Sequence, residues 1–311
     1  MMRRFFLLLL AFLCFLIPVG CADPDSGQKP SEPTVPSEPE VPEKPAYQNA
    51  YLDKKDGLKI LAIGNSFTYV STQYLWEVLD DLGFTNVKVA RLYIGGTSIS
   101  QHAANFSTNA SYSFDYKTGT KWRKAAMSAM NAVTSDEWDV ITLQQQSADA
   151  GNPSSFRDSD FDTIVNKLNA WNGNENYTLA WLMTWAYETG CDYQYFAQYN
   201  NDQSYMYECI VNTTIEKIIP NRMFTQIIPL GTAVQNARTG QLGDELTMDG
   251  YHLNDLGDYI AAVCWAKAMT NCDLSALDYV PETLKVYENL PEIARICAER
   301  AVSEMFVQNS Y

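Results

Sequence analysis

The sequence is poor in histidine, in positive charge and in motifs that hold metals or nucleotides. Its 311 residues contain 2 His and no Cys-x-x-Cys pair, which argues against a structural zinc site. Lys and Arg number 22 against 37 Asp and Glu, so the chain has few cations for binding nucleic-acid phosphates. Neither Gly-x-Gly-x-x-Gly nor Gly-Lys occurs. We therefore expect no nucleic-acid partner, no metal and no cofactor.

The N-terminal segment has the features of an export signal. Two arginines precede an apolar run at residues 5–17, which is too short to span a bilayer, and residues 1–20 are predicted to be a signal peptide. The following Cys21 lies in a sequence that resembles the lipobox of bacterial lipoproteins. That resemblance implies a membrane anchor through lipidated Cys21, on an outer-membrane or cell-surface lipoprotein of a Gram-negative bacterium. Simple secretion is the alternative.

The remaining chain divides into a linker and one domain. Proline occurs at every third position from Pro30 to Pro45, a spacing typical of extended polyproline II structure, so residues 21–56 are predicted to be a linker. Residues 57–311 show no second linker and are predicted to form one domain. Five of the seven cysteines lie in this domain, which allows at most two disulfides there and leaves the pairing open.

Short apolar runs alternate with longer amphipathic segments through this domain. Strands are predicted at residues 58–63, 87–93, 140–143, 177–183 and 224–228, and helices at residues 71–82 and 256–269. This alternation predicts a three-layer α/β/α sandwich, flavodoxin-like, with a mainly parallel five-stranded sheet. In such sheets ligands bind at the carboxyl ends of the strands, so reactive residues directly after a strand are candidates for the site.

Ser66 and His252 are the candidates for a nucleophile and its base. Ser66 follows the first predicted strand, where its hydroxyl would lie at the sheet edge, although a serine before a helix is more often an N-cap. His252 is one of only two histidines, and Asp249 lies three residues before it, within reach of the imidazole. The other histidine, His102, is interpreted as incidental or as part of a wall of the site. The three residues Ser66, His252 and Asp249 together predict a catalytic triad.

The order of these motifs resembles the SGNH/GDSL hydrolase superfamily over most of residues 58–270. Gly64-Asn65-Ser66 stands for its Gly-Asp-Ser block, Gly95-Gly96 for its second block, and Asp249 to His252 for its last. The third block, Gly-x-Asn-Asp, is replaced by the row Gln144-Gln145-Gln146. This variant resembles an uncharacterised bacterial branch known as a domain of unknown function.

The resemblance implies a mechanism and a set of site residues. Ser66 would attack an ester carbonyl, His252 would take and return the proton, and Asp249 would orient His252. The oxyanion would bind the N–H groups of Ser66 and of Gly95 or Gly96, together with the side-chain amide of Gln144, or of Gln145 as second choice. Residues predicted to bind substrate are Asn65, Trp185, Gln235 and Arg238, with core packing of Trp185 and acid pairing of Arg238 as alternatives.

These features predict a serine esterase that removes acyl groups, with acetyl favoured, from a carbohydrate or a small-molecule ester. A carbohydrate substrate is favoured because the protein is predicted to lie at the cell envelope, the domain is rich in aromatic residues, and the superfamily includes carbohydrate esterases. This choice of substrate is an inference by analogy. Two alternatives are open. One is a lipase or thioesterase of the same fold, which would show an exposed apolar lid, and the other is a catalytically silent glycan-binding lipoprotein. The oligomeric state is not predicted.

Overall fold

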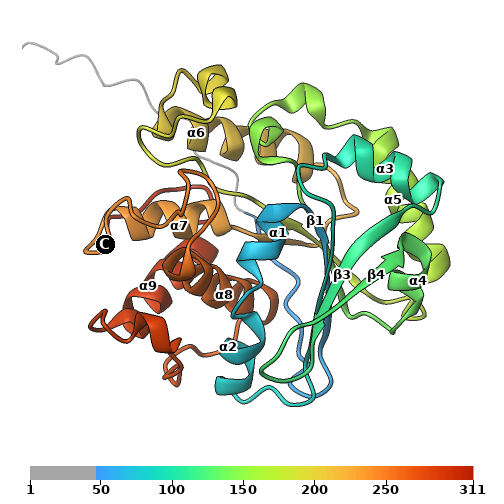
Figure 1. Cartoon of the computed structure of the whole chain (residues 1–311), viewed down its shortest axis with the longest axis horizontal. Coiled ribbons are helices and arrows are strands. Elements are labelled where there is room, and N and C mark those ends of the chain that lie inside the picture. The colour runs from blue at the N-terminus through green and yellow to red at the C-terminus, as the bar shows by residue number, and fades with distance from the viewer. Residues whose placement is uncertain (1–46, 311) are drawn as a thin grey trace, which may run out of the picture. The chain divides into compact units, whose positions relative to one another are not determined.

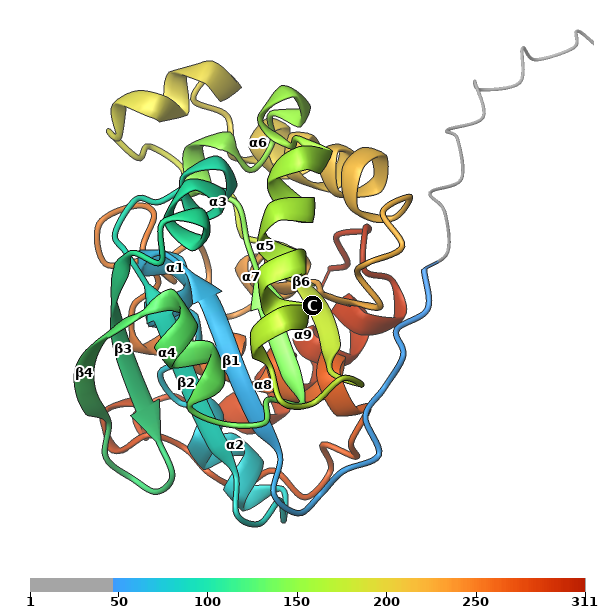
Figure 2. The same ribbon diagram turned by 90° about the vertical axis from the view of Figure 1, so that its right-hand side faces the viewer.

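A seven-stranded sheet forms the centre of the domain in the computed structural model, which describes residues 47–310 (Figures 1 and 2). Its strand order is β4-β3-β2-β1-β5-β6-β7. The strands are β1 (Lys59–Gly64), β2 (Lys88–Tyr93), β3 (Ser111–Lys117), β4 (Arg123–Ser128), β5 (Val140–Leu143), β6 (Thr178–Leu182) and β7 (Gln226–Ile228). The predicted signal peptide, Cys21 and residues 21–46 of the predicted linker lie outside the described residues.

The five predicted strands are confirmed, and they are parallel. β2-β1-β5-β6-β7 follow one another in the flavodoxin-like order 2-1-3-4-5. The prediction of five strands was incomplete, because β3 pairs antiparallel with β2, and β4 pairs antiparallel with β3 at the sheet edge. β4 is mostly exposed and reads Arg-Lys-Ala-Ala-Met-Ser, so it has no apolar run that could indicate a strand.

Helices cover both faces of the sheet and confirm the three-layer sandwich (Figure 1). One face carries α3 (Ile99–Ser107), α4 (Ala129–Thr134) and α5 (Asp158–Trp171). The other carries α1 (Ser66–Ser71), α2 (Leu75–Asp81), α7 (Leu230–Arg238), α8 (Asp255–Thr270) and α9 (Leu290–Ser303). The helix predicted at 71–82 is thus two helices, and the helix predicted at 256–269 is α8. The remaining elements are α6 (Gln203–Thr213), a π-helical turn η4 (Thr214–Ile218), and the 3₁₀ turns η1 (Ser147–Asp149), η2 (Pro153–Ser155), η3 (Gln194–Tyr199) and η5 (Glu282–Leu284).

Residues 47–56, which the sequence assigned to the linker, lie on the folded domain. The buried Asn49 side chain accepts a hydrogen bond from the Ile227 N–H and donates to the carbonyls of Ile227 and Ala268. These bonds satisfy backbone groups of α8 and of β7, the edge strand with which no further strand of the described residues pairs. The domain therefore begins before Gly57. Nothing in the sequence indicated this, because the attachment is made by the single polar side chain of Asn49, which has no recognisable pattern.

The five cysteines of the described residues are all free thiols, so neither of the two possible disulfides forms between them. Cys264 and Cys297 are buried on α8 and α9, where they act as small apolar side chains. Within residues 47–310 no helix is long and apolar enough to cross a membrane.

Candidate active site

Ser66 lies at the carboxyl end of β1, where the chain turns sharply into α1 (Figure 2). Gly64 makes this turn possible, because a Cβ there would come within 2.2 Å of Thr68 Oγ1. Asn65 caps the helix by accepting the Phe67 N–H at 2.9 Å. Ser66 is the first residue of α1, so its own N–H has no partner within the helix. The turn thus presents both the hydroxyl and an unused N–H at the edge of the sheet.

His252 reaches Ser66 from the loop that precedes α8. His252 Nε2 lies 2.8 Å from Ser66 Oγ, and His252 Nδ1 lies 2.7 Å from Asp249 Oδ2. Asp249 Oδ1 also accepts the backbone N–H groups of Tyr251 and His252, at 3.2 and 2.8 Å. The three predicted side chains, 186 residues apart at the extremes, therefore form one continuous hydrogen-bonded row.

Hydrogen bonds set the charge of this row. Partial burial raises the pKa of Asp249, but the bonds from the His252 side chain and from two backbone N–H groups outweigh it and hold that pKa below its usual range. Because the carboxylate is ionised, it accepts the Nδ1–H of His252, which leaves the Nε2 lone pair toward Ser66 Oγ. The arrangement can therefore remove the hydroxyl proton and stabilise the imidazolium that results.

Aromatic side chains hold the imidazole in place. Phe67 packs edge-on against His252, with ring centroids 5.7 Å apart, and stacks on Trp185 at 4.1 Å. Trp185 Nε1 donates to the carbonyl of Tyr251, the residue before His252, at 2.8 Å. Trp185 is fully buried, so it supports the histidine loop from below and does not face a substrate. Its prediction as a binding residue is corrected to the core role.

The turn after β2 supplies further unused N–H groups. Gly95 and Gly96 are exposed, and Gly96 has a φ of +68°, which glycine adopts without strain. Neither N–H donates to a backbone carbonyl of the described residues. Asn65 Nδ2 donates to Thr97 O at 3.0 Å and so ties this turn to the serine turn. Asn65 is itself buried, so its predicted contact with substrate is replaced by this tethering role.

The structure contradicts the assignment of Gln144 or Gln145 as oxyanion donor. Gln144 is completely buried, where its Nε2 donates to Asn65 Oδ1 at 2.7 Å and its Oε1 accepts from Thr68 Oγ1 at 2.8 Å. Gln145 is equally buried, and its Nε2 donates to the carbonyl and hydroxyl of Ser155. Both amides are committed to holding the loops together and neither faces the cleft.

Gln146 is the residue that sequence reasoning missed. It is half-buried, and its Oε1 accepts the Asp149 N–H at 3.2 Å. Its Nε2 donates to no group within residues 47–310, and the side chain lines a cavity together with Gly96. A signal for it was present in the sequence, because aligning Gly-x-Asn-Asp with Gln144 to Ser147 puts Gln146 at the Asn position.

The other two predicted binding residues are also inside the protein. Arg238 forms an ion pair with Asp244, with Arg238 Nε 2.7 Å from Asp244 Oδ1, and donates to Ala186 O and Gln235 Oε1. Gln235 in turn donates to Gln203 Oε1 at 3.1 Å. For Arg238 the alternative of acid pairing is the correct one. These bonds fasten the loop after β6 to α7, which replaces the predicted role of both residues in substrate binding.

His102 is fully buried and hydrogen-bonded to Tyr112, with His102 Nδ1 2.9 Å from the Tyr112 hydroxyl. Burial lowers its pKa to about 4, although a hydrogen bond with the backbone of Gly64 acts in the opposite direction. His102 therefore stays neutral and supports the serine turn from within the core. Among residues 47–310, no group of three His, Cys, Asp or Glu side chains is placed to hold a metal ion.

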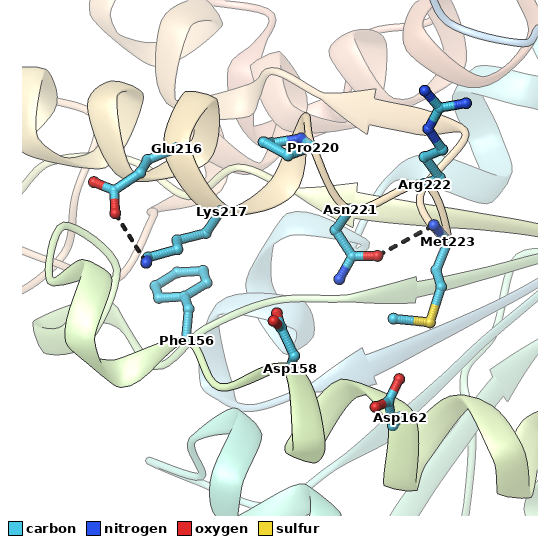
Figure 3. Close-up of a pocket in the computed structure, with 9 residues that line it drawn as sticks. All are labelled: Phe156, Asp158, Asp162, Glu216, Lys217, Pro220, Asn221, Arg222 and Met223. Atoms are coloured by element: carbon cyan, nitrogen blue, oxygen red, sulfur yellow. Dashed lines mark hydrogen bonds and ion pairs between the residues drawn. The ribbon is translucent and has the colours of Figure 1, made fainter.

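Two cavities are lined by residues of the site or by their neighbours. One of about 500 Å³ is lined by Gly96, Gln146, Tyr193 and their neighbours, and one of about 280 Å³ by Glu188, Asp249 and theirs. A larger cavity of about 570 Å³ lies elsewhere, between the start of α5 and residues 216–223 (Figure 3). Its nine lining residues include neither serine nor histidine, and we assign it no catalytic role.

Comparison with known proteins identifies a family without an assigned function. The model of the domain of unknown function DUF4886 matches residues 59–301. A crystal structure of a DUF4886 family protein from Bacteroides uniformis is 31% identical, covers 81% of this chain and 97% of its own, and superimposes with a TM-score of 0.75. No curated protein matches.

Weaker structural likenesses extend to named hydrolases. A putative SGNH hydrolase from Slackia heliotrinireducens is 19% identical over 68% of this chain and 98% of its own, with a TM-score of 0.44. An acetylxylan esterase from Geobacillus stearothermophilus is 11% identical over 70% of this chain and 96% of its own, with a TM-score of 0.42. Neither likeness bears on the activity of this chain.

Proposed function

The chain belongs to the DUF4886 family, and we propose that it is a cofactor-independent serine hydrolase of the SGNH type that cleaves carboxylic esters. The observation that carries the proposal is the row of Ser66 Oγ, His252 and Asp249, joined by contacts of 2.8 and 2.7 Å. A serine whose hydroxyl contacts a histidine, which is in turn oriented by a carboxylate, is the arrangement that activates a hydroxyl nucleophile.

In the proposed mechanism, Ser66 Oγ bonds to the ester carbonyl carbon while its proton passes to His252 Nε2. The carbonyl electron pair moves onto oxygen, where the N–H groups of Ser66 and of the Gly95–Gly96 turn and Nε2 of Gln146 bind it. Collapse breaks the bond to the alcohol, which leaves with the proton from His252. Water then attacks the acyl-serine, loses its proton to Nε2, and Ser66 recovers that proton as the carboxylic acid departs.

For the substrate we propose an acyl ester on a carbohydrate or small molecule, with acetyl favoured. Neither cavity near the site has an aliphatic wall: Ala148 is the only aliphatic residue that lines the one beside Gly96, and none lines the one beside Asp249, so neither suits the long chain of a lipase or thioesterase substrate. A silent glycan-binding protein would not require the aligned serine, histidine and aspartate. We propose in addition that the enzyme is held at the cell envelope by a lipid on Cys21.

Labelling with a fluorophosphonate tests the activity directly. We expect the probe to label the wild type on Ser66, to label the matched control Ser107→Ala, whose serine is exposed on α3, and not to label Ser66→Ala. p-Nitrophenyl acetate hydrolysis should be lost in Ser66→Ala and His252→Ala. A folded wild type, shown by its circular dichroism, that neither reacts with the probe nor hydrolyses the ester would refute the proposal.

A further inference from the structure

The cavity of about 500 Å³ has one wall in the proposed catalytic site. Gly96 and Gln146, both proposed oxyanion donors, line it from the sheet edge. Tyr193 lines it from the segment before η3 and stacks on Tyr251, with centroids 4.5 Å apart and planes inclined by 13°. The Tyr251 ring in turn lies 4.3 Å from the His252 ring. A group bound in this cavity would therefore adjoin the ester that Ser66 attacks.

Two tyrosines give this cavity an aromatic surface. Tyr195 packs edge-on against Tyr193, at 5.3 Å, and 48% of its side chain is exposed. Tyr51, Tyr205 and Tyr287 are similarly exposed, but of these four tyrosines only Tyr195 lines this cavity. A ring with an apolar face and a polar tip suits a ligand that has both C–H faces and hydroxyl groups.

The remaining walls offer hydrogen bonds. Ser98 and Gln101 begin α3, and Gln101 Nε2 donates to no group in residues 47–310. Asp149 lines the same cavity, and its carboxylate has neither a hydrogen bond nor an ion pair within that range. Partial burial raises the pKa of Asp149. An unpaired, partly buried carboxylate in a cleft indicates a group that is kept for a ligand.

Negative charge prevails on both sides of the site. Asp149 is the only charged residue that lines this cavity, and the neighbouring cavity is lined by Glu188, Asp192 and Asp249. Neither lining contains a lysine or an arginine. A carboxylate or sulfate on the ligand would face like charges here without a cation to balance them.

We propose that this cavity binds the alcohol part of the ester as a neutral sugar, and that Asp149 excludes sugars that carry carboxylate or sulfate groups. Tyr195 stacks on the sugar face, and Asp149 accepts a bond from a sugar hydroxyl. The inference rests on the proposed function, because it assigns the leaving group of that reaction.

Two substrates that differ only at C6, which is a neutral hydroxymethyl group in one and a carboxylate in the other, test the inference. These are the 2,3,4-tri-O-acetyl esters of methyl glucoside and of methyl glucuronide. At low salt we expect kcat/KM to be at least about tenfold higher for the glucoside, a ratio that corresponds to about 1.4 kcal/mol, because like charges close together near a protein surface repel. At 0.5 M NaCl the ratio should fall, since salt screens exposed charges. Asp149→Asn should reduce the ratio by raising kcat/KM for the glucuronide.

The proposed stacking of the sugar on Tyr195 is tested with a matched pair of variants. Tyr195→Ala should raise KM for the glucoside about fivefold, whereas Tyr205→Ala, which removes an equally exposed tyrosine on α6 outside the cavity, should leave KM unchanged. Both side chains are exposed enough for the variants to fold. Equal effects of the two substitutions would contradict the stacking contact.

Failure of this inference and failure of the proposed function have different signatures. If the wild type hydrolyses p-nitrophenyl acetate but treats the two sugar esters alike, or if Asp149→Asn leaves their ratio unchanged, the inference is overturned and the hydrolase stands. If the wild type hydrolyses nothing, the cavity inference is still tested by measuring, with NMR, how methyl glucoside and methyl glucuronide bind to Ser66→Ala. A preference for the glucoside there supports the cavity, and equal or absent binding overturns it.

Discussion

Replacing Gln146 should slow the chemical step without unfolding the protein. Gln146→Ala removes the one amide of the Gln144–Gln146 row whose Nε2 is unused in residues 47–310. Loss of one oxyanion donor lowers kcat about 10²- to 10³-fold, which corresponds to about 3–4 kcal/mol. KM should change little, because the bond forms in the transition state.

The same substitution should cost little stability. The only hydrogen bond that the Gln146 side chain makes in the described residues is the cap to the Asp149 N–H, worth about 0.5–1.5 kcal/mol. For a domain of this size, 1 kcal/mol lowers the Tm by about 2–4 °C. Gln146→Glu keeps the accepting oxygen but replaces the donor with negative charge, so it should retain the Tm and lose more activity than Gln146→Ala.

Gln144→Ala is the matched comparison and should behave in the opposite way. It leaves the buried Thr68 hydroxyl without an acceptor, at about 1–3 kcal/mol, and removes one of the two N–H donors of Asn65 Oδ1, which keeps only the Phe67 N–H. We therefore expect a large fall in Tm. Steady-state kinetics and thermal unfolding of Gln144→Ala and both Gln146 variants would check this. If folded Gln144→Ala lost kcat 100-fold while Gln146→Ala kept it within threefold, the reasoning from side-chain partners would be refuted.

Three further predictions concern stability. The pKa of His102 is about 4 in the folded protein and about 6.5 in the unfolded chain. The unfolded state therefore binds a proton first as pH falls, and the free energy of unfolding should decrease by about 3 kcal/mol between pH 6.5 and pH 4. Urea unfolding of His102→Leu should show a shallower loss over that range, and equal slopes would contradict the assignment. Asp258 is buried, and its Oδ1 has no hydrogen-bond partner in the described residues. Burial, with nearby Asp255, raises its pKa, so the stability that the protonated carboxyl gives the fold is lost as pH rises above about 4. Asp258→Asn should raise the Tm at pH 7 and leave it unchanged below pH 4, whereas a lower Tm at pH 7 would be inconsistent with this. Arg238→Met leaves Asp244 unpaired and should cost about 3–5 kcal/mol, and Arg238→Met combined with Asp244→Asn should recover part of it; no recovery in thermal unfolding would argue against the pair.

The sequence was informative about features that depend on neighbouring residues in the chain, such as buried strands and closely spaced reactive residues. The strands β1, β2, β5, β6 and β7 are short apolar runs with turns or amphipathic segments around them, because a parallel strand is buried on both faces. With only two histidines, and Asp249 three residues before one of them, the candidate row of Ser66, His252 and Asp249 could also be selected from residue types and spacing alone. The structure places these three in contact, and their catalytic role stays a prediction.

The sequence was uninformative where a role depends on which partner a polar side chain meets. Gln144, Gln145 and Gln146 are adjacent and chemically identical, and only the motif alignment distinguishes Gln146; in the structure two are bonded inside the protein and Gln146 lines the cleft. Arg238 could equally have faced a ligand, and only the position of Asp244 decides that it is an internal ion pair.

By itself, then, the sequence determined the five parallel strands and selected Ser66, His252 and Asp249 as candidates, because apolar periodicity and residue chemistry are local properties. The tertiary structure alone decided which partners bind the amides of Gln144 and Gln145, where the cavity beside Gly96 lies and that its charge is negative. Those properties depend on three loops, at residues 96, 146 and 193, that are far apart in the chain and adjacent in the fold. No local sequence pattern indicates that these loops line one cavity.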